Sequence, residues 1–207
     1  RTPFRMAGAV VGITCGMALS VGMITIHAGF AQAIALSFDV MDRSEATVSF
    51  THAVSDKTLF ELARHPGITR VEGRRDVPVI LRNGLQSHRG SITALPEGPE
   101  LFRALTPDLH PIAMRGEGLV LSRALASKLK LEVGERMTVD VREGAQPVLS
   151  LPVLAISETL LGAPAYMSLA GLNRVLGEPG RVSGAALLID EAEAAEVYAW
   201  LKGLPTV

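Results

Sequence analysis

Residues 118–139 read GLVLSRALASKLKLEVGERMTV, and this stretch predicts a strand, a helix and a second strand in close succession. The apolar run before Ser122 is typical of a buried strand, and the Ser122 side chain suits the N-cap of the helix that follows. Gly134 allows a tight turn before the second strand. Leucines recur at helical spacing, and we predict that four of them pack inward: Leu121, Leu125, Leu129 and Leu131.

A second helical segment lies downstream, where residues 166–177 read YMSLAGLNRVLG. It predicts a short helix that begins near Tyr166. Its buried face is predicted to consist of Leu169, Leu172, Val175 and Leu176. Both segments are read as core packing and not as ligand contacts.

Upstream of residue 118 the chain is rich in strand signals. Val77–Leu81 and Leu85–Ala94 read as strands, and Asn83-Gly84 between them is typical of a two-residue hairpin turn. Pro78 predicts that its strand lies at a sheet edge or is bulged. We therefore expect residues 77–177 to form an inserted, strand-rich subdomain.

The flanks of this insertion have a common pattern of strand and helix. On the N-terminal side, Ala46–Phe50 alternates as a strand does, and Ser55 reads as the N-cap of a helix. His65-Pro66-Gly67 ends that helix, and Ile68–Glu72 returns as a strand.

On the C-terminal side, Ala185–Ile189 reads as a strand and Glu191–Lys202 as an amphipathic helix. Leu204-Pro205-Thr206-Val207 has the layout of the earlier proline stop and suggests the first residue of a returning strand. Two such units predict an α+β fold, in which a ferredoxin-like split β-α-β layer carries the insertion.

The N-terminal region contains a long run without charge. Met6–Phe38 has no Lys, Arg, Asp or Glu, and Arg1 and Arg5 precede it. About 18 apolar residues suffice to span a bilayer core, so residues 1–38 predict a transmembrane helix with a stalk at roughly Ile26–Phe38. Basic flanks stay on the cytoplasmic side, which places the N-terminus inside and residues 39–207 outside a plasma (inner) membrane.

A cleaved secretory signal is the alternative, because Ala31-Gln32-Ala33 resembles a cleavage site. Signal peptides have apolar regions of about 7–15 residues, and Met6–Ile26 is longer than that. The chain also opens with Arg1, which suggests a segment of a longer protein. We therefore favour the spanning helix.

Small residues recur every four positions within this helix, at Gly8, Gly12, Gly16 and Ser20. This spacing places them on one helix face, where a second helix can approach closely in lipid. We predict helix packing along this small-residue strip. Cys15 is the only cysteine and has no internal disulfide partner.

The composition argues against several functions. A net charge of −1 and an aromatic content of 4% make nucleic-acid binding unlikely as a class. The sequence lacks a phosphate-binding loop and a serine nucleophile elbow, so no catalytic or cofactor-binding residue is predicted. No metal site is predicted either, because the histidines show no ligand spacing: His27, His52, His65, His88 and His110. Several arginines fall on neighbouring strands and read as a solvated sheet edge, with an acidic partner as the second interpretation: Arg70, Arg74, Arg75, Arg82 and Arg89.

From Arg1 to Val207 the chain resembles the FtsX/MacB-like permeases of ABC transporters. The segment at 118–139 is similar to the family pattern V-L-S-x-x-L-A-x-x-L-x-L-x-x-G-D, with Glu135 in place of the usual Asp. The segment at 166–177 is similar to the Y-x-x-L-x-x-L-x-x-L pattern found where the inserted subdomain returns to the β-α-β layer.

This resemblance implies a permease subunit that transmits motion from a separate cytoplasmic ABC ATPase to its extracytoplasmic domain. Family members use such motion for export, lipoprotein extraction or partner activation. The implied partners are the ATPase, a second permease copy or a homologous permease, membrane lipid, and a periplasmic adaptor or substrate protein. Two alternatives remain: the sensor or binding domain of a membrane receptor, and a secreted enzyme released after Ala33.

Overall fold

A computed structural model describes residues 3–35, 42–106, 110–159 and 162–204 of the 207-residue chain. It divides into two compact units, Arg1–Val40 and Met41–Val207, and each is described by itself.

The first unit contains a single long helix, α1 (Pro3–Ala35). Its segment Val10–Ala31 is long and apolar enough to cross a membrane. The hydroxyls of Thr14, Ser20 and Thr25 each donate to the carbonyl four residues earlier, at 2.8–2.9 Å. These polar groups are therefore satisfied within the helix, as a hydrocarbon environment requires.

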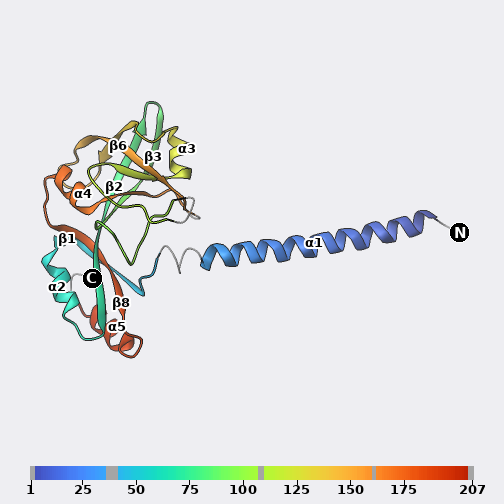
Figure 1. Cartoon of the computed structure of the whole chain (residues 1–207), viewed down its shortest axis with the longest axis horizontal. Helices are drawn as coiled ribbons and strands as arrows, with labels where there is room; N and C mark the ends of the chain where they lie inside the picture. Colours follow the sequence, from blue (N-terminus) through green and yellow to red (C-terminus); the bar gives the residue numbers. More distant parts are fainter. Residues whose placement is uncertain (1–2, 36–41, 107–109, 160–161, 205–207) are drawn as a thin grey trace. The chain divides into compact units, whose positions relative to one another are not determined.

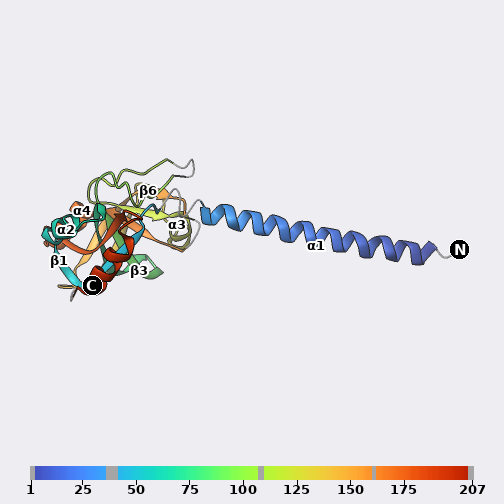
Figure 2. The same ribbon diagram turned by 90° about the horizontal axis from the view of Figure 1, so that it is seen from below.

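The second unit is an α+β structure, which confirms the predicted class (Figures 1 and 2). Its strands are β1 (Ala46–Ser55), β2 (Ile68–Asn83), β3 (Gln86–Leu95), β4 (Leu119–Ser122), β5 (Arg136–Val141), β6 (Val148–Ser157), β7 (Ala165–Ser168) and β8 (Arg181–Ile189). Its helices are α2 (Lys57–Ala63), α3 (Arg123–Leu129), α4 (Leu169–Leu176) and α5 (Ala194–Lys202).

One part of this unit is a three-stranded layer in the order β1-β8-β2. β8 runs antiparallel to both neighbours, so β1 and β2 are parallel to each other with β8 between them. Leu62 of α2 and Val197 and Leu201 of α5 share one hydrophobic cluster with Val48 and Leu187 of the strands. Both helices therefore cover the same face of the layer. His65 at the end of α2 also stacks on Trp200 of α5, with ring centroids 4.0 Å apart.

The other part is a closed barrel. The strand order continues β2-β3-β7-β4-β6-β5, and β5 pairs back to β2, which closes the circle. A second hydrophobic cluster joins the inward side chains of these strands to Leu125 of α3 and Leu172 of α4. Closure removes the free edges that an open sheet of short strands would leave. The sequence had indicated many strands here but not their closure.

β2 is one continuous strand, whereas we predicted two separate strands at 68–72 and 77–81. Its first half pairs with β8 from Ile68 to Arg74, and its second half pairs with β3 from Arg75 to Asn83. The three-stranded layer and the barrel therefore share this strand. The predicted edge or bulge at Pro78 was wrong, because β2 lies between β3 and β5 without a shift in register. The Pro78 carbonyl accepts from the Arg142 amide at 2.8 Å, and only the N–H that proline lacks is missing at this end of the β2–β5 pairing.

The β2–β3 turn lies one residue later than predicted. Asn83 pairs with Gln86, so Gly84 and Leu85 form the turn, and Gly84 has φ +56°. Glycine at the first central position is typical of a type II′ turn.

The helix caps were predicted with mixed success. Ser122 caps α3, because its Oγ accepts a 3.3 Å hydrogen bond from the Leu125 amide. Ser55 instead ends β1, and Asp56 occupies the N-cap position of α2. The helix expected near Tyr166 begins at Leu169, since Tyr166 belongs to β7. Residues 205–207, where we expected a returning strand to begin, lie outside the described residues.

Candidate functional site

The small-residue strip lies on α1, as predicted from its spacing. A Cβ atom added at Gly8, Gly12 or Gly16 would meet nothing within 4 Å among the described residues. The Ser20 hydroxyl is held by the Gly16 carbonyl at 2.9 Å. Within the described chain nothing fills this strip, so its use as a packing surface would need another helix.

The five arginines that read as a solvated edge have distinct environments. Three of them form ion pairs that are exposed or half-buried. These are Arg70–Glu100 at 2.5 Å, Arg74–Asp76 at 2.7 Å and Arg82–Asp140 at 2.8 Å. Arg89 is exposed, and the described part of the chain supplies no ion pair for it. Arg75 is buried with 1% of its surface exposed, so its assignment to a solvated edge was wrong.

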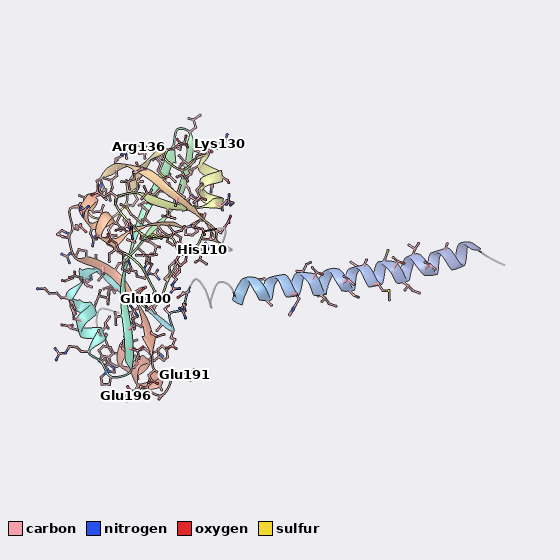
Figure 3. The ribbon with its side chains drawn as sticks, viewed as in Figure 1. Glu100, His110, Lys130, Arg136, Glu191 and Glu196 are labelled. Atoms are coloured by element: carbon pink, nitrogen blue, oxygen red, sulfur yellow. The ribbon has the colours of Figure 1, made fainter. Side chains whose placement is uncertain are left out.

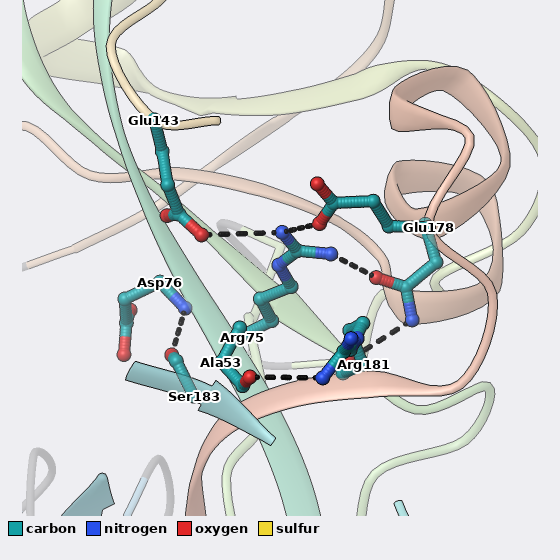
Figure 4. A network of polar contacts seen from close by, with 8 residues as sticks. Ala53, Arg75, Asp76, Glu143, Glu178, Arg181 and Ser183 are labelled. Atoms are coloured by element: carbon teal, nitrogen blue, oxygen red, sulfur yellow. Dashed lines mark hydrogen bonds and ion pairs between the residues drawn. The ribbon is translucent and has the colours of Figure 1, made fainter. Parts of the chain in front are cut away.

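Arg75 is the centre of a polar network where the barrel meets the three-stranded layer (Figure 4). Its Nη2 atom lies 2.5 Å from Glu178 Oε2 and 3.2 Å from Glu143 Oε1. Its Nη1 atom donates to Asn173 Oδ1 at 2.8 Å. The side-chain Nδ2 of Asn173 in turn donates to the backbone carbonyl of Arg181 at 2.9 Å.

These partners come from separate parts of the fold. Glu143 lies in the β5–β6 connection of the barrel, Asn173 on α4, and Glu178 in the connection to β8. Removing a guanidinium from water is costly unless charged partners and hydrogen bonds compensate it. The network therefore fixes where the β5–β6 connection and the end of α4 sit against β2. The Nε atom of Arg75 is buried without a hydrogen-bond partner among the described residues.

Asp76, the next residue of β2, makes a second connection between the same two parts. Its Oδ1 accepts from the Thr93 hydroxyl of β3 at 2.6 Å, and its backbone amide donates to the Ser183 hydroxyl of β8 at 2.8 Å. Arg74 completes the group by donating to Asp76 Oδ2. Successive residues of β2 therefore bond toward both the barrel and the layer.

Two titratable side chains of the barrel have shifted pKa values. Burial raises the pKa of Tyr166 to about 12, and the charge of Arg74 opposes this rise. Partial burial lowers the pKa of His88, and the neighbouring Lys128 ammonium lowers it further. Neither shift creates a pair of groups with complementary acid and base roles.

The sequence analysis missed the network, although one signal was present. Arg75 has the same strand parity as Val77, Val79 and Leu81, which all face the barrel core. Side chains two residues apart share a face of a strand, so this parity predicts an inward Arg75. Asn173 gave no comparable signal, because its role depends on where α4 lies in space.

One of three comparisons with known proteins, the one with solved structures, identifies this fold. No protein-family model matches the chain, and no curated protein matches it. Among solved structures, it is similar to the extracellular domain of the noncanonic ABC-type transporter YknZ from Gram-positive bacteria, with a TM-score of 0.53 and 11% identity. That match covers 73% of this chain and 88% of the YknZ domain. The chain has the fold of an ABC-type transporter's extracellular domain.

The periplasmic region of MacB from Actinobacillus actinomycetemcomitans is also similar, with a TM-score of 0.48 and 12% identity. That match covers 75% of this chain and 81% of the MacB region. At 11% identity the likeness to the YknZ domain shows a shared fold alone. It transfers no binding or catalytic residue to this chain.

Proposed function

We propose that this chain is part of a permease subunit of an ABC transporter, with an extracytoplasmic domain anchored by α1. The observation that carries the proposal is the fold likeness to the YknZ extracellular domain. The helix α1, which contains a candidate membrane span at Val10–Ala31, adds independent support. In this role ATP hydrolysis belongs to a separate cytoplasmic subunit, and the permease transmits the resulting motion outward.

The proposed topology places the N-terminus in the cytoplasm and residues after about 38 outside the plasma membrane. A helix of 33 residues is about 50 Å long, whereas a hydrocarbon core is about 30 Å thick. The excess supports a stalk, for which the sequence suggested roughly Ile26–Phe38. Residues 36–38 of that segment lie outside the described part of the chain.

The proposed division of the chain is a helix at 1–38 and a domain at 39–207, with 77–177 inserted. We also propose that the layer is ferredoxin-like. The position of β8 between the parallel strands β1 and β2, with α2 and α5 on one face, supports this. Among the described residues β1 pairs only with β8, so its outer edge can accept a further strand.

The decisive experiment is purification of the full-length membrane protein from its native cells in mild detergent. A phosphate-loop ATPase should copurify at fixed stoichiometry, and its ATPase rate should depend on the permease. Recovery of the protein without any ATPase, in preparations where the fold is intact, would contradict the proposal.

The topology is tested with single cysteines in a Cys15→Ser background. A cysteine at the exposed position Ser87 should react with a membrane-impermeant maleimide in intact cells. Labelling of Ser87→Cys only after cell lysis would place the domain inside and overturn the topology.

The small-residue strip is proposed to pack against a second spanning helix, from another permease copy or a homologous permease. A Gly12→Leu change should impair dimer assembly or ATPase coupling, because the leucine would prevent close approach. Gly22→Leu is the matched control, since Gly22 lies about 100° from the middle of the strip. A Cβ atom added at Gly12 or Gly22 meets nothing within 4 Å among the described residues. Unchanged pull-down of a second permease and unchanged ATPase stimulation would refute the packing role.

A further inference from the structure

The outer face of the barrel over β3, β2 and β5 carries an excess of arginines. Arg82, Arg89 and Arg142 are exposed there, and the one carboxylate among them is Asp140. Three arginines against one aspartate give this group a charge of +2 in a chain whose net charge is −1. We call these four residues, together with Pro78 and Ile80, the basic barrel face.

Strand register defines how this face is arranged. Ile80 of β2 lies directly between Arg89 of β3 and Asp140 of β5. Asp140 Oδ2 accepts from Arg82 at 2.8 Å and lies 3.6 Å from Arg142 Nη2. A single carboxylate therefore serves two guanidinium groups on one side of Ile80.

On the other side of Ile80, Arg89 has no ion-pair partner in the described part of the chain. An open hollow of about 450 Å³ lies between Arg89 and Arg142. Pro78, Val79, Ile80 and Gly90 line the rest of it, and the outward side chains of Pro78 and Ile80 give it an apolar floor. Neighbouring strands are about 4.8 Å apart, which puts β3, the strand of Arg89, about 10 Å from β5, the strand that Arg142 directly follows.

We propose that the basic barrel face binds an acidic segment of a partner protein, in which carboxylates flank an apolar side chain. Guanidinium groups bind carboxylates in a bidentate geometry, and arginine is enriched in protein interfaces. The apolar side chain would cover Pro78 and Ile80 while the carboxylates meet Arg89 and Arg142. A lipid phosphate would satisfy the arginines but would leave this apolar floor exposed to water.

Figure 3 labels charged residues at both ends of this unit. Arg136 and Lys130 lie at the barrel end, and Glu191 and Glu196 lie at the α5 end. Glu132 and Glu135 are exposed between Lys130 and Arg136, so that end of the barrel carries both signs of charge. The excess of positive charge is therefore confined to the basic barrel face, where an acidic segment would be attracted.

The test uses the full chain in uncharged detergent micelles and a fluorescent ten-residue peptide that contains Glu-Leu-Glu. Binding is followed by fluorescence anisotropy, and a peptide with Gln-Leu-Gln is the matched probe. We expect the acidic peptide to bind at least about tenfold more tightly, and its affinity to fall as salt is raised. Equal affinity for the two peptides would overturn the proposal.

Variants then locate the binding site. Arg89→Gln removes a charge that has no ion pair in the described chain, so the fold should be unaffected, and acidic-peptide binding should weaken several-fold. The triple change Arg82→Gln, Arg89→Gln and Arg142→Gln should weaken binding by at least about tenfold. The matched control replaces three exposed arginines elsewhere: Arg64, Arg115 and Arg174. An equal loss in this control would show non-specific attraction and reject the site.

Vesicles distinguish a protein partner from a lipid surface. Binding of the same variants to phosphatidylcholine vesicles is measured with and without anionic lipid. Arginine-dependent binding to anionic vesicles, without peptide binding, would overturn the proposal in favour of a lipid contact. The inference does not depend on the permease assignment, since failure to copurify an ATPase would leave the peptide result unchanged.

Discussion

The buried guanidinium of Arg75 donates a 2.8 Å hydrogen bond to Asn173 Oδ1, which lies 98 residues further along the chain. This bond joins the strand shared by the barrel and the layer to the helix α4. With Glu143 and Glu178 it makes Arg75 the centre of contacts from three separate chain segments. One side chain therefore contacts all three segments.

Replacing Arg75 by methionine should lower the free energy of unfolding by about 2 kcal/mol, because it leaves the buried Asn173 Oδ1 without its donor. Glu143 and Glu178 are 34% and 40% exposed, so water can solvate their carboxylates when the guanidinium is removed. Denaturant unfolding of the full chain in micelles, followed by circular dichroism, measures this change. Arg174→Met is the control, since the Arg174–Glu117 pair is exposed and should contribute less than about 1 kcal/mol. Equal losses for the two variants would contradict a structural role for the network.

The raised pKa of Tyr166 predicts a loss of stability at alkaline pH. Its pKa is about 12 in the folded protein, against about 10 in an unfolded chain. The stabilising contribution is therefore complete below pH of about 10 and is lost as the pH rises through about 12. At about 1.4 kcal/mol per pKa unit the total is about 3 kcal/mol.

Tyr166→Phe should remove this alkaline loss, which unfolding curves across that pH range would reveal. The exposed Tyr198→Phe is the control, because it is the only other tyrosine. If both variants keep the same alkaline slope as the parent, the slope does not come from Tyr166.

Gly171→Ala should destabilise the protein by about 1–3 kcal/mol. The added Cβ would overlap the Gly116 carbonyl oxygen, so α4 or the neighbouring loop would have to shift. Arg174→Ala on the same helix is exposed and should change the free energy of unfolding by less than about 0.5 kcal/mol. Thermal unfolding of the two variants decides the matter, and an unshifted midpoint for Gly171→Ala would disprove the close packing.

Replacing the N-cap serine of either barrel helix by alanine should lower the free energy of unfolding by about 1 kcal/mol. Ser122 accepts from the Leu125 amide at 3.3 Å, and Ser168 accepts from the Gly171 amide at 3.2 Å. Because the caps are on different helices, the stability losses from Ser122→Ala and Ser168→Ala should add in the double variant. Exposed Ser87→Ala serves as the control in the same denaturant titration. A loss no larger than that control would mean that the caps do not stabilise these helices.

Local sequence patterns predicted an element well where they indicate a single structure, as a charge-free run or an apolar periodicity does. The charge-free run predicted α1, and the inward face of residues 118–139 is confirmed, since Leu121, Leu125 and Leu129 are fully buried. Errors arose at boundaries. The signals for two short strands at 68–72 and 77–81 belong to one strand, because β2 exchanges one partner for another at Arg74 and Arg75 without interruption. Pairing of this kind leaves no turn residue to mark it in the sequence.

The amino-acid sequence alone determined the long apolar helix, the α+β class and the helix α3 capped by Ser122. These features depend on the periodicity of apolar residues, on the absence of charge, and on side chains that hydrogen-bond to backbone groups no more than four residues away. The tertiary structure decided that the barrel closes through β2 and β5, that Arg75 is buried, and that Arg89 and Arg142 lie on either side of Ile80. Most of these relationships join residues more than fifty positions apart, as in the pairs Val79–Val141, Arg75–Asn173 and Arg89–Arg142. Only chain folding sets which distant strands become neighbours.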